Sequence, residues 1–333
     1  MTSQHGDASA AAARQAAERC AWQKAFDLYA AAESTGPLDA IDLEQWATAA
    51  YLVGRVDTAI DALTKAVQHS IANGDEERAV VAMHWIIYMH IGRGDMAQVS
   101  GWMTRAQPIL ERLPDDSPGR GWFVALDAFL DTAVHGQSEQ GMARAKNAVA
   151  TARRTGDPDL LVMALNVLGR SLLRMGDTAG MTPLDEAMVV IVGGTVSPIP
   201  AGTVYCSVIE ACEEIADVRR AQEWTEALDA WCSRQGDMVT FTGRCLIHRS
   251  SLLSQRGEWQ AAVAEARRAC DRLAGAADEV SSGRAHYQLG ELARLTRNHE
   301  KANTRRRPGG DTTPNRDSHS FDWPRATWAP LQP

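Results

Sequence analysis

The strongest constraint on the fold of this chain is a repeat of about 40 residues. Each unit contains a helix-forming stretch, a short turn rich in Gly, Asp or Asn, a second alanine-rich stretch and a polar loop. The turns within units are Gly54-Arg55, Gly94-Asp95, Gly136-Gln137, Gly176-Asp177, Asp217-Val218, Gly257-Glu258 and Asn298-His299, and an earlier one is expected near Cys20–Trp22. Because glycine adopts a positive φ at little cost, these positions predict helix ends.

The spacing of apolar residues indicates which face of each predicted helix is buried. Tyr205, Val208, Ile209 and Cys212 fall at i, i+3, i+4 and i+7, which is one stripe of a helix. A hairpin of two such helices cannot bury its apolar faces alone, whereas a stack of hairpins forms one continuous core. The sequence therefore predicts an all-α fold, a tetratricopeptide-like α-solenoid of antiparallel helix hairpins with a period of about 40 residues.

The repeat also divides the chain. We expect a flexible N-terminus over 1–12, the helical-repeat array over 13–299, and a disordered Pro/Arg-rich tail over 300–333, where apolar periodicity is lost. Because the pattern stops midway through a unit, the tail is expected to be a truncation or frameshift product; the alternative is a natural flexible tail. Re-reading the coding DNA in its other two frames would separate the two.

This expectation has a consequence for the last predicted helix, Gly283–Arg297. Without a partner helix it would expose Tyr287, Leu289, Leu292 and Leu295. We therefore expect fraying, or self-association through this uncapped end, because repeat arrays need a polar final unit.

Charge and composition exclude several classes of protein. The formal net charge is −8, and the body over 1–300 is more acidic still because the last 33 residues carry an excess of three positive charges. An acidic body is a poor match for nucleic-acid phosphates. No stretch of 18 apolar residues suggests a membrane span, and the N-terminus lacks the features of a secretory signal. The six cysteines show no paired spacing, which favours reduced thiols and a cytoplasmic location.

Motifs for catalysis and cofactor binding are missing from the sequence. Gly193-Gly194 has no following lysine, so it does not form a phosphate-binding loop. No C-x-x-C or H-x-x-x-H pair suggests a metal site, and His84 and His90 lie on different faces of one apolar stretch. No Ser-His-Asp or Cys-His arrangement stands in a motif. We therefore expect no enzyme activity, no cofactor, no metal and no DNA-binding module in this chain.

Acidic and aromatic side chains are the remaining candidates for recognition. Glu210 and Glu214 share a helix face, with Glu213 beside them. They could form a solvated or salt-bridged face with nearby arginines, line a recognition groove, or act in acid/base catalysis. The tryptophans at 85, 102, 224, 231 and 259 are expected to wedge between hairpins, the alternative being that some line a groove.

Several segments bear a family resemblance. They are Ala49–Arg55, Leu184–Met188, Ser197–Cys212, Arg219–Thr225, Trp231-Cys232, Cys245–Arg249 and Tyr287–Leu292. Together they resemble the helical-repeat region of actinobacterial LuxR-type transcriptional regulators, from about residue 10 to about residue 297. The resemblance implies a tetratricopeptide-like array that senses a partner or signal and precedes a C-terminal helix-turn-helix domain. That domain is absent from this sequence, so no DNA-contacting residue carries over.

Taken together, these features predict a regulatory or protein-interaction scaffold, the repeat region of a truncated LuxR-type regulator. The concave face, lined by the first helix of each hairpin, would bind a protein, a peptide or a small signalling ligand. The residues expected to contribute are Tyr205, Glu210, Glu213, Glu214, Trp224 and His248. The alternatives are a stand-alone adaptor and, less favoured, a helical-repeat enzyme.

Overall fold

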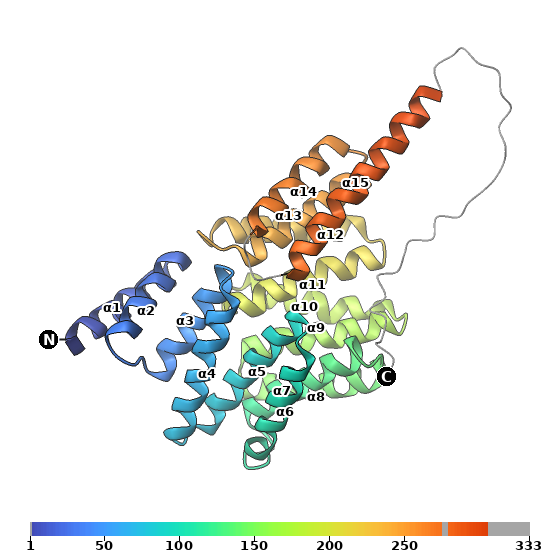
Figure 1. The fold of residues 1–333 in the computed structure, drawn as a ribbon. Coiled ribbons are helices and arrows are strands. Elements are labelled where there is room, and N and C mark those ends of the chain that lie inside the picture. The colour runs from blue at the N-terminus through green and yellow to red at the C-terminus, as the bar shows by residue number, and fades with distance from the viewer. Residues whose placement is uncertain (1, 275–278, 306–333) are drawn as a thin grey trace.

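The chain is all-α throughout the part that a computed structural model describes, residues 2–274 and 279–305. Within these ranges it has fifteen α-helices and one 3₁₀ turn, arranged as successive antiparallel hairpins (Figure 1). Each helix packs mainly on its neighbours in the chain, and the first helices of adjacent hairpins also touch. The predicted fold class is confirmed.

Seven hairpins and one further helix make up the array. They are α1 (Thr2–Glu18) with α2 (Trp22–Thr35), α3 (Ala40–Leu52) with α4 (Val56–Ala72), α5 (Glu76–Arg93) with α6 (Met96–Leu110), α7 (Pro118–Ala133) with α8 (Ser138–Thr155), α9 (Pro158–Arg174) with η1 (Thr178–Gly180) and α10 (Met181–Val192), α11 (Pro198–Glu214) with α12 (Val218–Ser233), α13 (Thr240–Gln255) with α14 (Trp259–Leu273), and finally α15 (Glu279–Arg305).

The turns inside hairpins lie where the glycines predict them. Gly54, Gly94 and Gly136 have φ values of 80°, 77° and 69°, in the left-handed region that glycine adopts without strain. Where glycine is missing, another residue takes this conformation: Cys20 has a φ of 55° before α2, and Ala216 has a φ of 59° before α12.

Both ends of the array differ from the sequence prediction. The predicted turn at Asn298-His299 is wrong, because α15 continues to Arg305. No glycine or proline occurs between Gly290 and Pro308 to stop it. At the other end the sequence predicts flexibility over 1–12, whereas α1 begins at Thr2 and Ala10 is buried. The alanine-rich surface of α1 packs closely on α2. The predicted tail lies outside the described residues from 306 onward.

Side chains one repeat apart connect successive units. Arg93 pairs with Asp57 across 2.5 Å, and Arg78 pairs with Glu44 across 2.7 Å. Thr132 and Ser171 form a buried hydroxyl–hydroxyl hydrogen bond of 2.7 Å. Each bond joins neighbouring hairpins, and the last two join first helices to one another.

The array also curls back on itself, and its N-terminal hairpins contact the hairpin of α13. The Val239 amide donates to the Leu52 carbonyl at 2.8 Å, and the Thr240 hydroxyl donates to the Tyr51 carbonyl at 2.7 Å. Nearby, Trp22 Nε1 donates to Gln235 Oε1 at 3.2 Å. One hydrophobic core joins residues from α1 to α13. We call this contact the closure seam.

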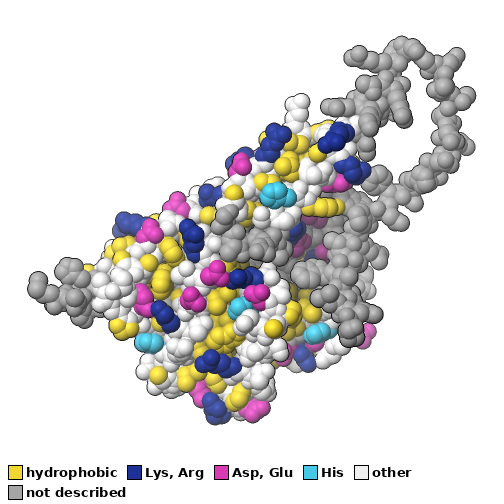
Figure 2. Space-filling view, in the orientation of Figure 1, with side chains coloured by type: hydrophobic (Ala, Val, Ile, Leu, Met, Phe, Trp, Pro, Cys, Tyr) yellow, Lys and Arg dark blue, Asp and Glu magenta, His cyan; other side chains and the backbone are white. Residues whose placement is uncertain are grey.

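The surface is mixed in charge. On the face shown in Figure 2, basic and acidic side chains are interspersed over the helices rather than gathered by sign. Across residues 2–274 and 279–305, no helix combines the length and apolar character needed to span a bilayer.

Candidate functional site

The six sequence-predicted residues come together around α11, α12 and α13, but several are buried. Tyr205 is only 3% exposed, and its ring packs 5.9 Å from the ring of Trp231. His248 is 1% exposed, and Trp224 is half-buried with its indole Nε1 buried and unbonded. These three side chains belong largely to the core.

Two of the predicted carboxylates are held in ion pairs. Glu210 pairs with Arg284 of α15 and lies 3.7 Å from Arg244 of α13. Burial alone would raise the pKa of Glu210, but Arg284 and Arg244 outweigh it and lower the pKa to about 2. Glu214 pairs with Arg170 of α9 at 2.7 Å. These carboxylates connect neighbouring first helices.

Glu213 faces His248 from the adjacent helix. Its Oε1 lies 3.8 Å from His248 Nδ1. Burial opposes a charge on His248, but Cys206 and Glu213 outweigh it and raise the pKa of His248 to about 10. Nε2 of the same ring is buried and has no hydrogen-bond partner among the described residues. Glu213 also lines a small recess of about 260 Å³.

This arrangement matches the salt-bridged reading of the acidic cluster. Glu210 and Glu214 bind arginines of neighbouring hairpins, and Glu213 binds a buried histidine. Ligand or partner binding by the six residues stays a prediction.

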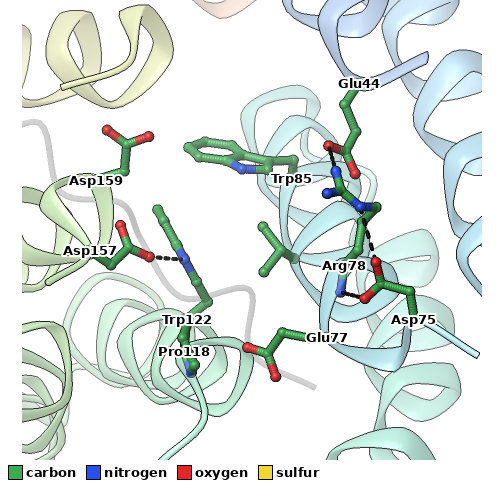
Figure 3. Close-up of a pocket in the computed structure, with 10 residues that line it drawn as sticks. Glu44, Asp75, Glu77, Arg78, Trp85, Pro118, Trp122, Asp157 and Asp159 are labelled. Atoms are coloured by element: carbon green, nitrogen blue, oxygen red, sulfur yellow. Dashed lines mark hydrogen bonds and ion pairs between the residues drawn. The ribbon is translucent and has the colours of Figure 1, made fainter. Parts of the chain in front are cut away.

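A different part of the same series of helices forms a more open site. A pocket of about 330 Å³ lies across four successive first helices, α3, α5, α7 and α9, and the loops that precede them (Figure 3). We call it the acidic–aromatic pocket. Its lining residues are Glu44, Asp75, Glu77, Arg78, Val81, Trp85, Pro118, Trp122, Asp157 and Asp159.

Two indoles form the aromatic wall of the acidic–aromatic pocket. The rings of Trp85 and Trp122 lie 5.4 Å apart at an interplanar angle of 58°. The buried ring of His84 contacts both, at 5.1 Å from Trp85 and 4.7 Å from Trp122. Burial lowers the pKa of His84 to about 3, so it is neutral near pH 7. The indoles therefore have a neutral support behind them.

Three carboxylates, one from α5 and two from the start of α9, bind backbone amides at the starts of first helices. Asp157 caps α9 by accepting from Leu160 N at 3.0 Å, and its other oxygen accepts from Trp122 Nε1 at 3.0 Å. Asp159 accepts from Ser197 N at 2.7 Å, just before α11, and Glu77 accepts from Gly119 N in α7. Carboxylates at helix N-termini are favoured by the helix dipole, which explains their position.

Arg78 neutralises part of the opposite wall. It binds Glu44 at 2.7 Å and Asp75 at 3.2 Å. Burial raises the pKa of Glu44 to about 7 despite the attraction of Arg78. Five carboxylates and one guanidinium line the pocket, so it carries a formal excess of four negative charges when all are ionised. Over the described ranges, no group of three or more His, Cys, Asp or Glu side chains has an arrangement that could hold a metal ion.

The sequence interpretation did not identify this pocket, although it left open that some tryptophans line a groove. Trp85 does so while packing against the core; the others named with it are also half-buried against core residues. The acids come from three repeats, so they are distant in sequence. A signal existed: Asp75 and Asp157 each follow a glycine and each begin a first helix.

Comparison with known proteins gives coarse structural similarity only. The sequence matches no family profile, and a comparison with curated proteins found no match. A STAND signal-transduction ATPase with a tetratricopeptide repeat sensor, from Pyrococcus horikoshii, is 16% identical over 85% of this chain and 43% of its own, with a TM-score of 0.45. The apo form of RapI is 11% identical over 83% and 81%, with a TM-score of 0.39. The chain spans less than half the length of the ATPase.

Proposed function

We propose that this chain is a regulatory, protein-interaction scaffold that binds an extended segment of a protein partner along its first helices. The observation that carries the proposal is the acidic–aromatic pocket, a recess formed jointly by four repeats. A recess that crosses several units suits a ligand that runs along the array, and stacked repeats present such extended surfaces. A small signalling ligand in the same recess is the second candidate, because 330 Å³ is within the usual range for such sites.

We also propose a cytoplasmic regulator related to the repeat region of LuxR-type proteins. The support is the resemblance of the segments that form α11 and the start of α12. The alternative is an adaptor that acts without a DNA-binding partner domain. In both cases the repeat array would supply recognition rather than catalysis.

Filling the pocket tests the proposal. Val81 lines it, so Val81→Trp should block it, whereas Val189→Trp adds the same side chain on α10, where Val189 is 70% exposed. A random-peptide display selection against the unmodified chain should yield sequences that bind it and Val189→Trp equally. These peptides should lose on the order of tenfold in affinity for Val81→Trp, because a few buried contacts carry most of the energy of such interactions.

Circular dichroism melts of both variants establish that they are folded. Peptides that bind Val81→Trp as well as the unmodified chain would overturn the placement of the site. A selection that yields no binding peptide, combined with saturable binding of a small molecule lost in Val81→Trp, would favour the second candidate.

A further inference from the structure

We propose that the acidic–aromatic pocket takes the guanidinium head of an arginine side chain from the partner segment. This inference rests on the proposed function and names the chemistry of the same site. Three features of the pocket carry it: its charge, its paired indoles and a guanidinium already bound within it.

The charge of the pocket selects for a cation. Asp157 and Asp159 lie across the pocket from Arg78, and Glu77 precedes Arg78 on α5 (Figure 3). The hydrogen bonds that these three carboxylates accept come from neutral N–H donors. A backbone amide or an indole N–H leaves a carboxylate its full negative charge. Carboxylates grouped in a recess attract a cation more strongly than isolated surface groups do, because the recess limits solvent screening. An acidic ligand would meet repulsion from all three.

The indoles select for a flat, weakly hydrated cation. The rings of Trp85 and Trp122 meet at 58°, with Trp85 half-buried and Trp122 only 3% exposed. Cations bind favourably over indole faces, so the face offered to a ligand is mainly that of Trp85. His84 behind them is neutral, so it does not repel a cation. Guanidinium is planar, stacks on aromatic rings and donates two parallel hydrogen bonds to a carboxylate, whereas ammonium is a compact, strongly hydrated charge.

The structure contains an internal example of this binding. The Arg78 guanidinium lies at the edge of the pocket and joins Glu44 and Asp75, carboxylates from two successive repeats (Figure 3). Glu77 of α5 and Asp159 of α9 are two further carboxylates that line the pocket. A second guanidinium from the partner would complete the pattern beside the indole walls.

The test uses the full chain and a short blocked glycine–serine peptide that carries arginines, together with its citrulline twin. Citrulline has the shape of arginine but no charge. Calorimetric titration should show that the arginine peptide binds the chain. The citrulline twin should bind with an affinity lower on the order of tenfold. Binding should also weaken when salt rises from about 0.05 M to about 0.5 M.

Charge-removing variants locate the effect. Glu77→Gln with Asp159→Asn removes two charges but keeps a carbonyl that can accept from Gly119 N and Ser197 N. It should lose on the order of tenfold in affinity for the arginine peptide, since two charge-assisted contacts become neutral. The matched control, Glu139→Gln with Asp271→Asn, removes the same charges from exposed positions on α8 and α14 and should change affinity by less than about twofold.

Three outcomes would overturn the inference. They are equal affinity for the arginine and citrulline peptides, equal loss in the pocket and control variants, and tighter binding of free spermidine than of the arginine peptide. None of these outcomes contradicts the proposed function. That function is contradicted only if the selected peptides bind Val81→Trp as well as they bind the unmodified chain. A neutral consensus from the peptide selection, lost in Val81→Trp, would retain the scaffold and reject the arginine site.

Discussion

At the scale of single residues, the interior holds more polar groups than the apolar repeat pattern suggests. Tyr88 of α5 bonds Thr203 of α11 at 2.8 Å, and Glu210 binds arginines of α13 and α15. A buried polar group is costly unless it is paired. These pairs therefore fix which helices face one another, in a core where alanine and leucine would allow several registers.

His248 gives a prediction of pH dependence. Its pKa is raised from the ordinary value of 6.5 to about 10 in the folded chain, where Cys206 and Glu213 of α11 face it. A raised pKa means that the stabilisation is fully present below pH 6.5 and is lost as the pH rises towards 10. We expect the free energy of unfolding to fall by about 4 kcal/mol between pH 6.5 and pH 10 because of His248.

Urea unfolding of the unmodified chain and of His248→Gln at several pH values measures this contribution. Glutamine cannot take up the proton, so the difference in stability between the two chains should shrink as the pH rises. Other buried groups that titrate at high pH affect both chains and cancel in the difference. A difference that stays constant between pH 6.5 and pH 10 would show that His248 is neutral.

The sequence predicted part of this residue-level picture. The spacing of Glu210 and Glu214 on one helix face indicates a shared surface that nearby arginines can pair with, and Arg170 pairs with Glu214 in the structure. The pairing of Glu210 with Arg284 could not be predicted, because it depends on how α15 crosses α11. The acidic–aromatic pocket could not be predicted for the same reason, since its acids come from three repeats.

At the scale of helices, close packing depends on a few glycines. Gly169 of α9 faces Gly180 of η1, and a Cβ at position 169 would come within 2.6 Å of the Gly180 carbonyl and 2.5 Å of Leu184 Cγ. We expect Gly169→Ala to lower the free energy of unfolding by about 2 kcal/mol, because the hairpin must separate to admit the methyl group.

Gly92, also within a helix, is the matched control. A Cβ there meets nothing within 4 Å, so Gly92→Ala should leave stability unchanged or raise it by less than about 1 kcal/mol. Chemical denaturation of both variants makes the comparison. If Gly169→Ala were as stable as Gly92→Ala, the close approach of α9 and η1 would be contradicted.

Most hairpin boundaries followed from local chemistry, because a positive φ at glycine is a property of one residue. Helix ends without such a residue were harder to predict. In the turn before α12, Ala216 adopts the positive φ, and nothing in the local sequence distinguishes this alanine. Helix α15 continues past a predicted turn because no glycine or proline stops it. The sequence predicts that Leu292 and Tyr287 of α15 are exposed. Leu292 is instead fully buried against α14, whereas Tyr287 is 65% exposed.

At the scale of the whole molecule, the closure seam is the feature that the repeat could not predict. Each hairpin specifies only its offset from the next, and small offsets accumulate over seven hairpins into the curl that brings α13 to α3. The seam joins residues that are far apart in the chain, with a sequence separation of 189 between Thr240 and Tyr51. An open solenoid would unfold from its ends independently, whereas a closed one couples them.

This coupling is testable with two Thr→Val substitutions. Thr240 and Thr225 are both 3% exposed, but the Thr240 hydroxyl bonds Tyr51 across the seam, whereas the Thr225 hydroxyl bonds Ala221 of its own helix. We expect Thr240→Val to cost about 1 kcal/mol, because it removes the hydrogen bond across the seam to the Tyr51 carbonyl, which keeps only its local donor, the Gly54 amide. Amide exchange near the end of α3 should therefore accelerate by about fivefold, in hydrogen-exchange mass spectrometry under native conditions.

Thr225→Val should leave exchange in α3 unchanged, because it acts only within α12. Equal exchange rates in α3 for both variants would mean that the two ends of the array open independently. The seam would then contribute nothing to the stability of α3.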